Sequence, residues 1–176
     1  MNLDARFAHE LTSFGERVKE VRTRKKLTQP NLGALANMRV SNISRIEKGS
    51  TNLKLATIIR LADAFKVTLS TLFDEKGGKI IHIRKKYKVA EERFEDEKKR
   101  MGLRIEGLTK HRNLKQDELA ILAKIDAADI SRYINGDGNI EFFNIVKIAH
   151  ALEVELIDIF NYNGTFPDNK RFKGRL

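Results

Sequence analysis

Histidines and acidic residues are the side chains best suited to acid–base or metal chemistry, and their spacing predicts neither. None of the four histidines has a carboxylate or a second histidine at a spacing that would form a general-base pair or a metal site: His9, His82, His111 and His150. The sequence has no cysteine, no glycine-rich phosphate loop and no serine nucleophile elbow. We therefore predict no enzymatic activity, no metal site and no cofactor.

Basic residues dominate the charged side chains. The 176 residues contain 34 Lys and Arg against 24 Asp and Glu, a net charge of +10. This balance favours a polyanionic partner such as nucleic acid. No apolar run approaches the ~18 residues that a membrane span needs, and the absence of cysteine is typical of a reducing compartment. We expect a cytoplasmic protein that makes no membrane contact.

The sequence repeats itself after 87 residues. The stretch NISRIEKGSTN (42–52) returns as DISRYINGDGN (129–139), and residues 14–73 align without a gap with residues 101–160, with 18 identities in 60 positions. The identities are mostly apolar residues at helical spacing or turn glycines. Solenoids need about three or more stacked repeats, so two units of this length indicate tandem domains.

Each unit is predicted to form five short helices. Thr28 is a suitable N-cap and Pro30 fits only the first turn of a helix, so one helix begins near Gln29. A second helix begins around Val40 and ends at Gly49, after a connection of only three or four residues. Two short helices separated by so tight a turn are typical of a helix-turn-helix.

The stretch LTQPNLGALANMRVSNISRIEKGSTNLKLATIIRLADAFKVTLSTLF (27–73) resembles the Cro/CI-like (XRE) helix-turn-helix family of phage-repressor type. Its most specific parts are the LTQ start, the ISRIEKG end of the recognition helix and the apolar tail. The stretch LKQDELAILAKIDAADISRYINGDGNIEFFNIVKIAHALEVELIDIF (114–160) looks like a more diverged member. The resemblance implies an all-α fold, with two tandem five-helix lambda-repressor-like domains joined by a charged linker.

The resemblance also implies which side chains meet double-stranded DNA. In this family the recognition helix lies in the major groove, and the start of the preceding helix meets a phosphate. Carried over, four residues become base or groove contacts and four become backbone contacts: Arg39, Val40, Ser41 and Arg45 in the groove, and Gln29, Asn42, Lys48 and Asn52 at the backbone. The planar fork of Arg45 can pair with O6 and N7 of guanine. Arg39 replaces a usual capping serine, which leaves open a later helix start capped by Ser41.

Charge distinguishes the two copies. Residues 14–73 hold 12 Lys and Arg against 4 Asp and Glu, a net +8, whereas residues 101–160 hold 7 against 10, a net −3. At the groove positions the second copy offers two acids, two alanines and one cation: Asp126, Ala127, Ala128, Asp129 and Arg132. Asp126 suits a helix N-cap, but Asp129 would face phosphates or guanine acceptors. We predict that only the first copy reads DNA.

The second copy is also more apolar. Five of its residues replace small or polar ones: Leu103 for Glu16, Ile121 for Ala34, Ile134 for Glu47, Phe143 for Ala56 and Ile157 for Ser70. We expect the first-copy positions to face solvent, so the replacements predict a self-association surface, the alternative being a larger private core. In the family, the glutamate at Glu47 pairs with a first-helix arginine, here Arg22, and the second copy has lost both partners.

Composition sets apart three further segments: an N-terminal extension (1–13), a charged, partly helical linker (74–100) and a basic tail (161–176), which we expect to be mobile. In the linker, KIIHIRKKYKV (79–89) is compatible with a short strand, and its cations with either a phosphate-binding ribbon or a solvated face. From about Val89 the sequence favours a backward extension of the second domain's first helix.

These observations predict a sequence-specific DNA-binding transcriptional regulator. It would be a homodimer through the second domain (101–160) and read a (pseudo)palindromic site with the first domain (14–73). Two alternatives stay open. One is an antitoxin-like protein-interaction module whose acidic second domain binds a protein partner, and the other is a restriction-modification controller protein.

Overall fold

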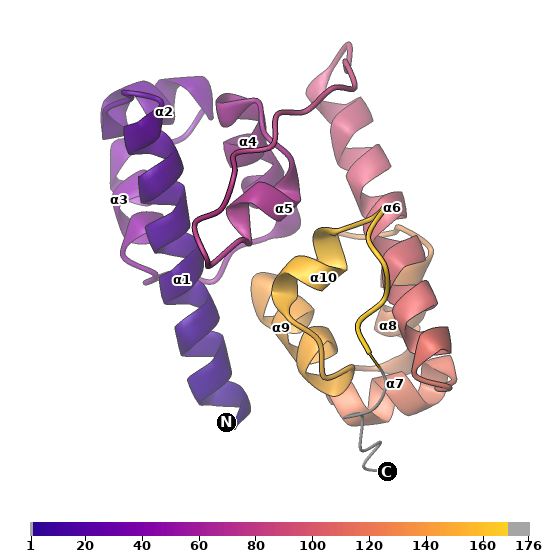
Figure 1. Ribbon diagram of the computed structural model, residues 1–176. Coiled ribbons are helices and arrows are strands. Elements are labelled where there is room, and N and C mark those ends of the chain that lie inside the picture. The colour runs from indigo at the N-terminus through magenta and orange to yellow at the C-terminus, as the bar shows by residue number, and fades with distance from the viewer. Residues whose placement is uncertain (1, 169–176) are drawn as a thin grey trace. The chain divides into compact units, whose positions relative to one another are not determined.

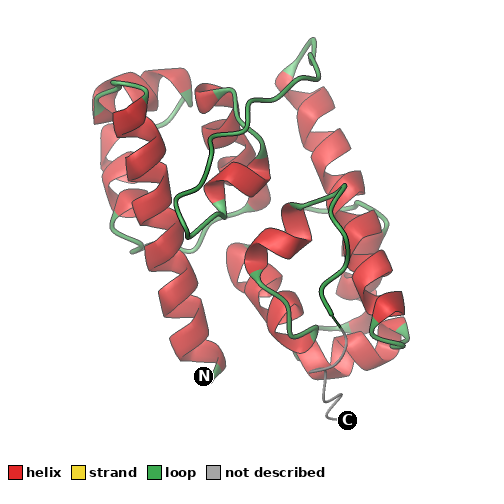
Figure 2. Ribbon diagram, viewed as in Figure 1, coloured by secondary structure: helices red, strands yellow, loops and turns green. Residues whose placement is uncertain are grey.

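The structure, a computed structural model, describes residues 2–168, and within this range its elements are helices joined by loops (Figures 1 and 2). The chain forms two compact units that divide between residues 90 and 91. The first unit holds α1 (Leu3–Arg24), α2 (Gln29–Leu35), α3 (Val40–Glu47), α4 (Leu55–Phe65) and α5 (Leu69–Leu72). The second holds α6 (Ala90–His111), α7 (Gln116–Ala123), α8 (Ala127–Ile134), α9 (Phe142–Ala151) and α10 (Leu156–Phe160). The all-α prediction of five helices per unit is confirmed.

Helix starts follow local capping chemistry. The Thr28 side chain accepts from the Asn31 N–H and caps α2, with Pro30 in the first turn as predicted. α3 begins at Val40, and its N-cap Arg39 makes no side-chain capping hydrogen bond. The alternative of a later start capped by Ser41 is therefore wrong, because Ser41 already lies inside the first turn of α3.

A glycine on the first helix of each unit lets that helix approach the second helix of the helix-turn-helix closely, which is α3 in the first unit and α8 in the second. A Cβ added to Gly15 of α1 would lie 2.4 Å from the carbonyl oxygen of Ile46, and one added to Gly102 of α6 would lie 2.2 Å from that of Ile134. Both distances are far shorter than a carbon–oxygen contact allows. Glycine therefore recurs after 87 residues because both units need the same close backbone contact.

Each unit has its own apolar core. In the first, α1, α3, α4 and α5 contribute side chains that are fully or almost fully buried, among them Val18, Ile43, Leu61 and Leu72. In the second, the corresponding positions are Ile105, Ile130, Ile148 and Ile159, all buried. The apolar spacing of the repeat thus encodes the same core twice.

A buried arginine on the first helix of each unit binds both the last helix of that unit and the loop that follows it. Arg17 Nε donates to the Thr71 carbonyl at 2.8 Å, and Arg17 Nη2 to the Gly78 carbonyl at 3.2 Å. Arg104, 87 residues later, donates from Nε to the Asp158 carbonyl at 2.8 Å. Its other two nitrogens donate to the carbonyls of residues 164 and 165 at 2.8 and 3.1 Å. These bonds satisfy both the buried guanidinium and the loop backbone.

The segment after α10 is therefore packed as far as residue 168. Tyr162 Oη donates to Glu97 at 2.9 Å, and His111 Nε2 donates to the carbonyl of Pro167 at 3.0 Å. The predicted basic tail therefore makes contacts with α6 in its first part, 161–168. The rest of the predicted tail, 169–176, lies outside the described residues.

The two other segments set apart on composition also contain ordered structure. α1 starts at Leu3 and runs without a break through the expected extension 1–13, with Leu11 buried. Residues 79–89 form no strand of their own: His82 makes a single antiparallel bridge with Val67. α6 begins at Ala90, which confirms the backward extension of the second unit's first helix. Among residues 2–168, no helix has the length and apolar character to cross a membrane.

Candidate nucleic-acid interface

The helix-turn-helix of the first unit presents a polar face on α3. Ile43 and Ile46 are buried, whereas Val40 is 43% exposed and Ser41, Asn42 and Arg45 are exposed. Helical spacing alone predicted this division, because residues three apart share one side of a helix. Arg39 and Lys48, which flank α3, are also exposed. The four predicted groove residues therefore lie on, or directly before, the outward face of α3.

The predicted backbone contact Gln29 lies at the start of α2 and is held by Glu47 at the end of α3. Gln29 Nε2 donates to Glu47 Oε2 at 2.8 Å. Arg22 of α1 donates to the same carboxylate from Nε at 2.6 Å and from Nη2 at 3.1 Å. The hydrogen bond to Glu47 raises the pKa of Arg22 above its ordinary value. The predicted Arg22–Glu47 pair is confirmed, and it fixes the start of α2 relative to α3.

Glu47 is buried, with 8% exposure. The expectation that this position faces solvent was wrong, because the family's ion pair lies in the interface between α1, α2 and α3. Its counterpart Ile134 therefore replaces a buried charge and not a surface residue. The second unit has Thr109 at the arginine position, and its hydroxyl donates to the carbonyl of Ile105 within the same helix at 2.7 Å.

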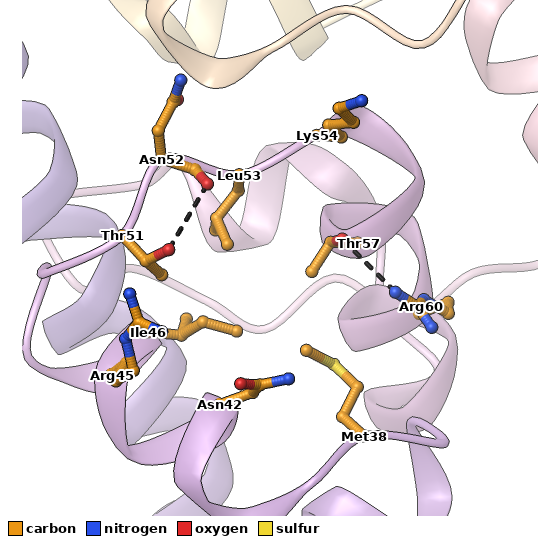
Figure 3. Close-up of a pocket in the computed structure, with 10 residues that line it drawn as sticks. All are labelled: Met38, Asn42, Arg45, Ile46, Thr51, Asn52, Leu53, Lys54, Thr57 and Arg60. Atoms are coloured by element: carbon orange, nitrogen blue, oxygen red, sulfur yellow. Dashed lines mark hydrogen bonds between the residues drawn. The ribbon is translucent and has the colours of Figure 1, made fainter.

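Three of the predicted contacts surround one pocket (Figure 3). Asn42, Arg45 and Asn52 line it together with residues from the α3–α4 loop and α4. Prediction from the sequence missed two cations in this lining, Lys54 and Arg60. A signal was present at Lys54, because the repeat replaces it with an acid. Only the tertiary structure, which puts Arg60 of α4 in the same pocket lining as Asn42 and Arg45 of α3, reveals Arg60.

In the second unit, α8 has acidic and small residues at the corresponding face. Asp126 caps the helix by accepting from the Ala128 N–H at 2.8 Å, as predicted. Asp129 Oδ1 lies 3.1 Å from Arg132 Nη1, so the one cation at these groove positions is paired with an acid. This face is unlike that of α3 in both charge and chemistry.

The five predicted self-association residues do not form a uniform set. Leu103 on α6 and Ile121 on α7 are 66% and 67% exposed. Ile134, Phe143 and Ile157 are half-buried. Leu103 and Ile121 are thus the two of the five that expose most of their apolar surface.

Within the described residues, no cluster of histidine and acidic side chains could hold a metal ion. Each of the two units has five helices, and two short ones among them are joined by a tight turn: α2 and α3 in the first unit, α7 and α8 in the second. The fold and this site define a protein with two helix-turn-helix domains. The chain belongs to the helix-turn-helix family HTH_3, of the XRE type, which matches residues 18–72 and 108–159. The resemblance predicted from the sequence is confirmed for both copies.

Two further proteins show local similarity. The HTH-type transcriptional repressor RghR of Bacillus subtilis (strain 168) is 37% identical over 68 residues, which are 38% of this chain and 50% of RghR. The chain therefore matches about half the length of this relative. The restriction-modification controller protein C.AhdI from Aeromonas hydrophila is 35% identical, with a TM-score of 0.36, and the match covers 37% of this chain and 98% of C.AhdI.

Proposed function

We propose that the protein is a sequence-specific transcriptional regulator that binds double-stranded DNA through its first unit. The observation that carries the proposal is the outward face of α3, where Val40, Ser41, Asn42 and Arg45 are exposed on a helix held by a tight turn. A guanidinium at Arg45 can donate to the O6 and N7 atoms of a guanine in the major groove. The similarity to a transcriptional repressor supports regulation as the outcome.

The predicted contacts divide into two groups by their chemistry. Arg39, Val40, Ser41 and Arg45 are the base or groove contacts, and Gln29, Asn42, Lys48 and Asn52 are the backbone contacts. Base contacts discriminate between sequences, whereas phosphate contacts set register and affinity. The net +8 of residues 14–73 supports this role, since attraction to the phosphates supplies much of the binding free energy. The protein would bind bacterial DNA in the cytoplasm.

The proposal extends to assembly. The second unit would join two chains into a homodimer that reads a (pseudo)palindromic site, since two domains on one duplex meet half-sites about one helical turn apart. The exposed Leu103 and Ile121 support a contact through this unit. The net −3 of residues 101–160 and the paired Arg132 support its exclusion from DNA. A foreign protein partner on the acidic unit is the competing outcome.

Selection from a random pool of double-stranded DNA by the full-length protein tests the function. We expect enrichment of one sequence with two related half-sites, and weaker binding to a scrambled duplex at the same salt concentration. A pool that stays random after selection would contradict sequence-specific binding. The mass of the purified protein in solution, measured with and without the selected duplex, tests assembly: a monomer in both conditions would contradict the homodimer.

A further inference from the structure

Part of the loop between α5 and α6 (Figure 1) is extended and pairs along one edge with the turn between α4 and α5. The Ile81 carbonyl accepts from the Thr68 N–H at 3.0 Å, and the Ile83 N–H donates to the Lys66 carbonyl at 3.2 Å. These two bonds flank the antiparallel bridge at His82, as they do in a sheet. The extended segment therefore pairs with the turn as a strand does, over a single bridge.

The opposite edge of this segment is open. Successive N–H groups of an extended chain point to opposite edges, so the N–H of His82 points away from the turn, together with those of Ile80 and Arg84. Among residues 2–168, no backbone hydrogen bond uses the N–H or the carbonyl of these three residues. His82 and Arg84 are exposed, and Ile81 is 52% exposed. We call residues 80–84 the edge segment; it offers free backbone donors and acceptors, to which an extended peptide can add as a further strand.

Within residues 91–168 of the second unit, the equivalent edge is closed. Pro167 stands at the position of Ile80, and proline lacks the N–H that a strand edge needs. The carbonyl of Glu153, the counterpart of Lys66, accepts from Arg112 Nη2 at 3.3 Å. An arginine side chain thus binds where the extended segment binds in the first unit. The open edge is therefore a feature of the first unit and not a by-product of the shared fold.

Charge indicates what kind of strand the edge segment accepts. The stretch 79–89 contains five cations and no acid, and all five are exposed: Lys79, Arg84, Lys85, Lys86 and Lys88. A second copy of the chain would set cations opposite cations, which weakens a ladder, whereas carboxylates opposite the same cations stabilise one. The exposed Ile81 adds apolar surface that a β-branched side chain can cover. The complementary occupant is therefore an extended peptide with both acidic and β-branched residues.

We propose that the edge segment binds an acidic, extended peptide of another protein, which adds to it as a further strand through the backbone of His82. The carboxylates of the peptide would lie opposite Lys79 and the cations that follow Ile83. The inference goes beyond the proposed function and does not depend on it, because the edge segment contains none of the residues assigned to DNA. Nucleic acid is the competing polyanion. It cannot continue the ladder, because it has no row of amide N–H and carbonyl groups at strand spacing.

Amide hydrogen exchange in the full-length protein tests the inference, with a synthetic peptide as probe. The probe is a blocked peptide of about six residues, the usual length of a strand, in which valine alternates with glutamate. At about ten times its dissociation constant, it should slow exchange of the His82 N–H about tenfold. The Ile83 N–H already bonds to Lys66 and should change less than about twofold. A peptide with lysine in place of glutamate is the matched control and should slow neither amide.

Two variants separate the backbone contact from the charge. His82→Pro removes the outward N–H, retains both bonds to the turn and should weaken the acidic peptide at least about fivefold, the loss of one hydrogen bond. Lys79→Glu with Lys85→Glu should make the edge segment prefer the lysine peptide. Lys19→Glu with Lys26→Glu reverses two exposed cations elsewhere in the first unit and should leave the preference for the glutamate peptide unchanged.

Equal slowing at His82 and Ile83 would overturn strand addition, as would parent-like affinity in His82→Pro while the Ile83 N–H stays protected. If that protection is lost, the variant has lost the bridge itself and the charge-reversed variant decides: an unchanged preference for the glutamate peptide would contradict the inference. Binding of single-stranded DNA by the parent, with no binding of the peptide, would assign these cations to nucleic acid and likewise overturn it. None of these outcomes bears on recognition of double-stranded DNA through α3.

Discussion

The two units share a fold but stabilise its helix-turn-helix in different ways. In the first, a carboxylate at Glu47 binds Arg22 and Gln29 at the junction of three helices, and a basic pocket adjoins α3. In the second, Thr109 and Ile134 replace the ion pair, and the charged face becomes acidic. The shared backbone therefore depends on features that both units keep, the apolar repeat and the two glycines. The polar groups around the helix-turn-helix differ between the units, whereas the buried arginine on the first helix, Arg17 or Arg104, is kept in both.

The largest effect on stability should come from removing one partner of the Arg22–Glu47 ion pair. Glu47→Ala leaves the guanidinium of Arg22 without its carboxylate in a largely buried site and should destabilise the first unit by about 3–5 kcal/mol. Arg22→Thr with Glu47→Ile copies the second unit, removes both charges and should cost less than about 1 kcal/mol. Hydrogen exchange of the α1 and α3 amides measures each stability. Equal losses in the two variants would contradict the interpretation of Ile134 as a joint replacement.

A second prediction concerns the exposed apolar residues of the second unit. Leu103→Glu with Ile121→Ala restores the first-copy residues and should weaken dimer formation by about 2–3 kcal/mol, because each parent side chain buries apolar area on association. Sedimentation at several concentrations measures the shift towards monomer. Glu16→Leu with Ala34→Ile in the first unit is the reciprocal control. A parent-like mass with parent-like helix content would place the dimer contact elsewhere.

Arg45 and Arg132 occupy the same position of the repeat, but only Arg45 should contribute to DNA binding. Arg45→Ala should weaken binding to the selected duplex by about 1–3 kcal/mol and relax preference at one base pair, because a bidentate base contact is lost. Arg132→Ala is the matched change in the second unit and should leave binding as it was, since this arginine is paired with Asp129. Competition with single-base variants of the duplex measures both. Equal effects would mean that both units read DNA.

The smallest effect is the pH dependence that Glu10 adds to the stability of the first unit. Burial raises the pKa of the Glu10 carboxyl above its ordinary value, against the opposing effect of Arg6, and Glu75 raises it further. The folded state then binds this proton more tightly than the unfolded state, so stability falls as pH rises from about 4.5 through the raised pKa. Glu10→Gln cannot ionise and should lose this dependence.

Denaturation of the parent and Glu10→Gln proteins at about pH 4 and about pH 7 measures the difference, which should shift in favour of the variant at the higher pH. Glu16→Gln on the exposed side of the same helix controls for the loss of one negative charge. A stability difference that is constant across this pH range would contradict the role assigned to burial at Glu10.

The sequence alone was enough to predict the tandem organisation, the helices and the division of α3 into a buried and an exposed side. These features follow from interactions within a few residues: apolar spacing, the Thr28 cap and the position of Pro30. It also determined the contrast in charge between the copies, because replacement of Lys54 by Glu141 or Asn42 by Asp129 is visible without any packing.

The surroundings of each side chain depend on the tertiary structure and could not be predicted from the sequence. Glu47 is buried because α1 and α2 both close over it, and Leu103 and Ile121 are exposed because no described element of their own unit covers them. Arg60 lines a pocket with residues of α3, and Arg104 binds carbonyls more than fifty residues away. Helical periodicity gives the direction of a side chain from its own helix, whereas its neighbours depend on how distant segments pack together.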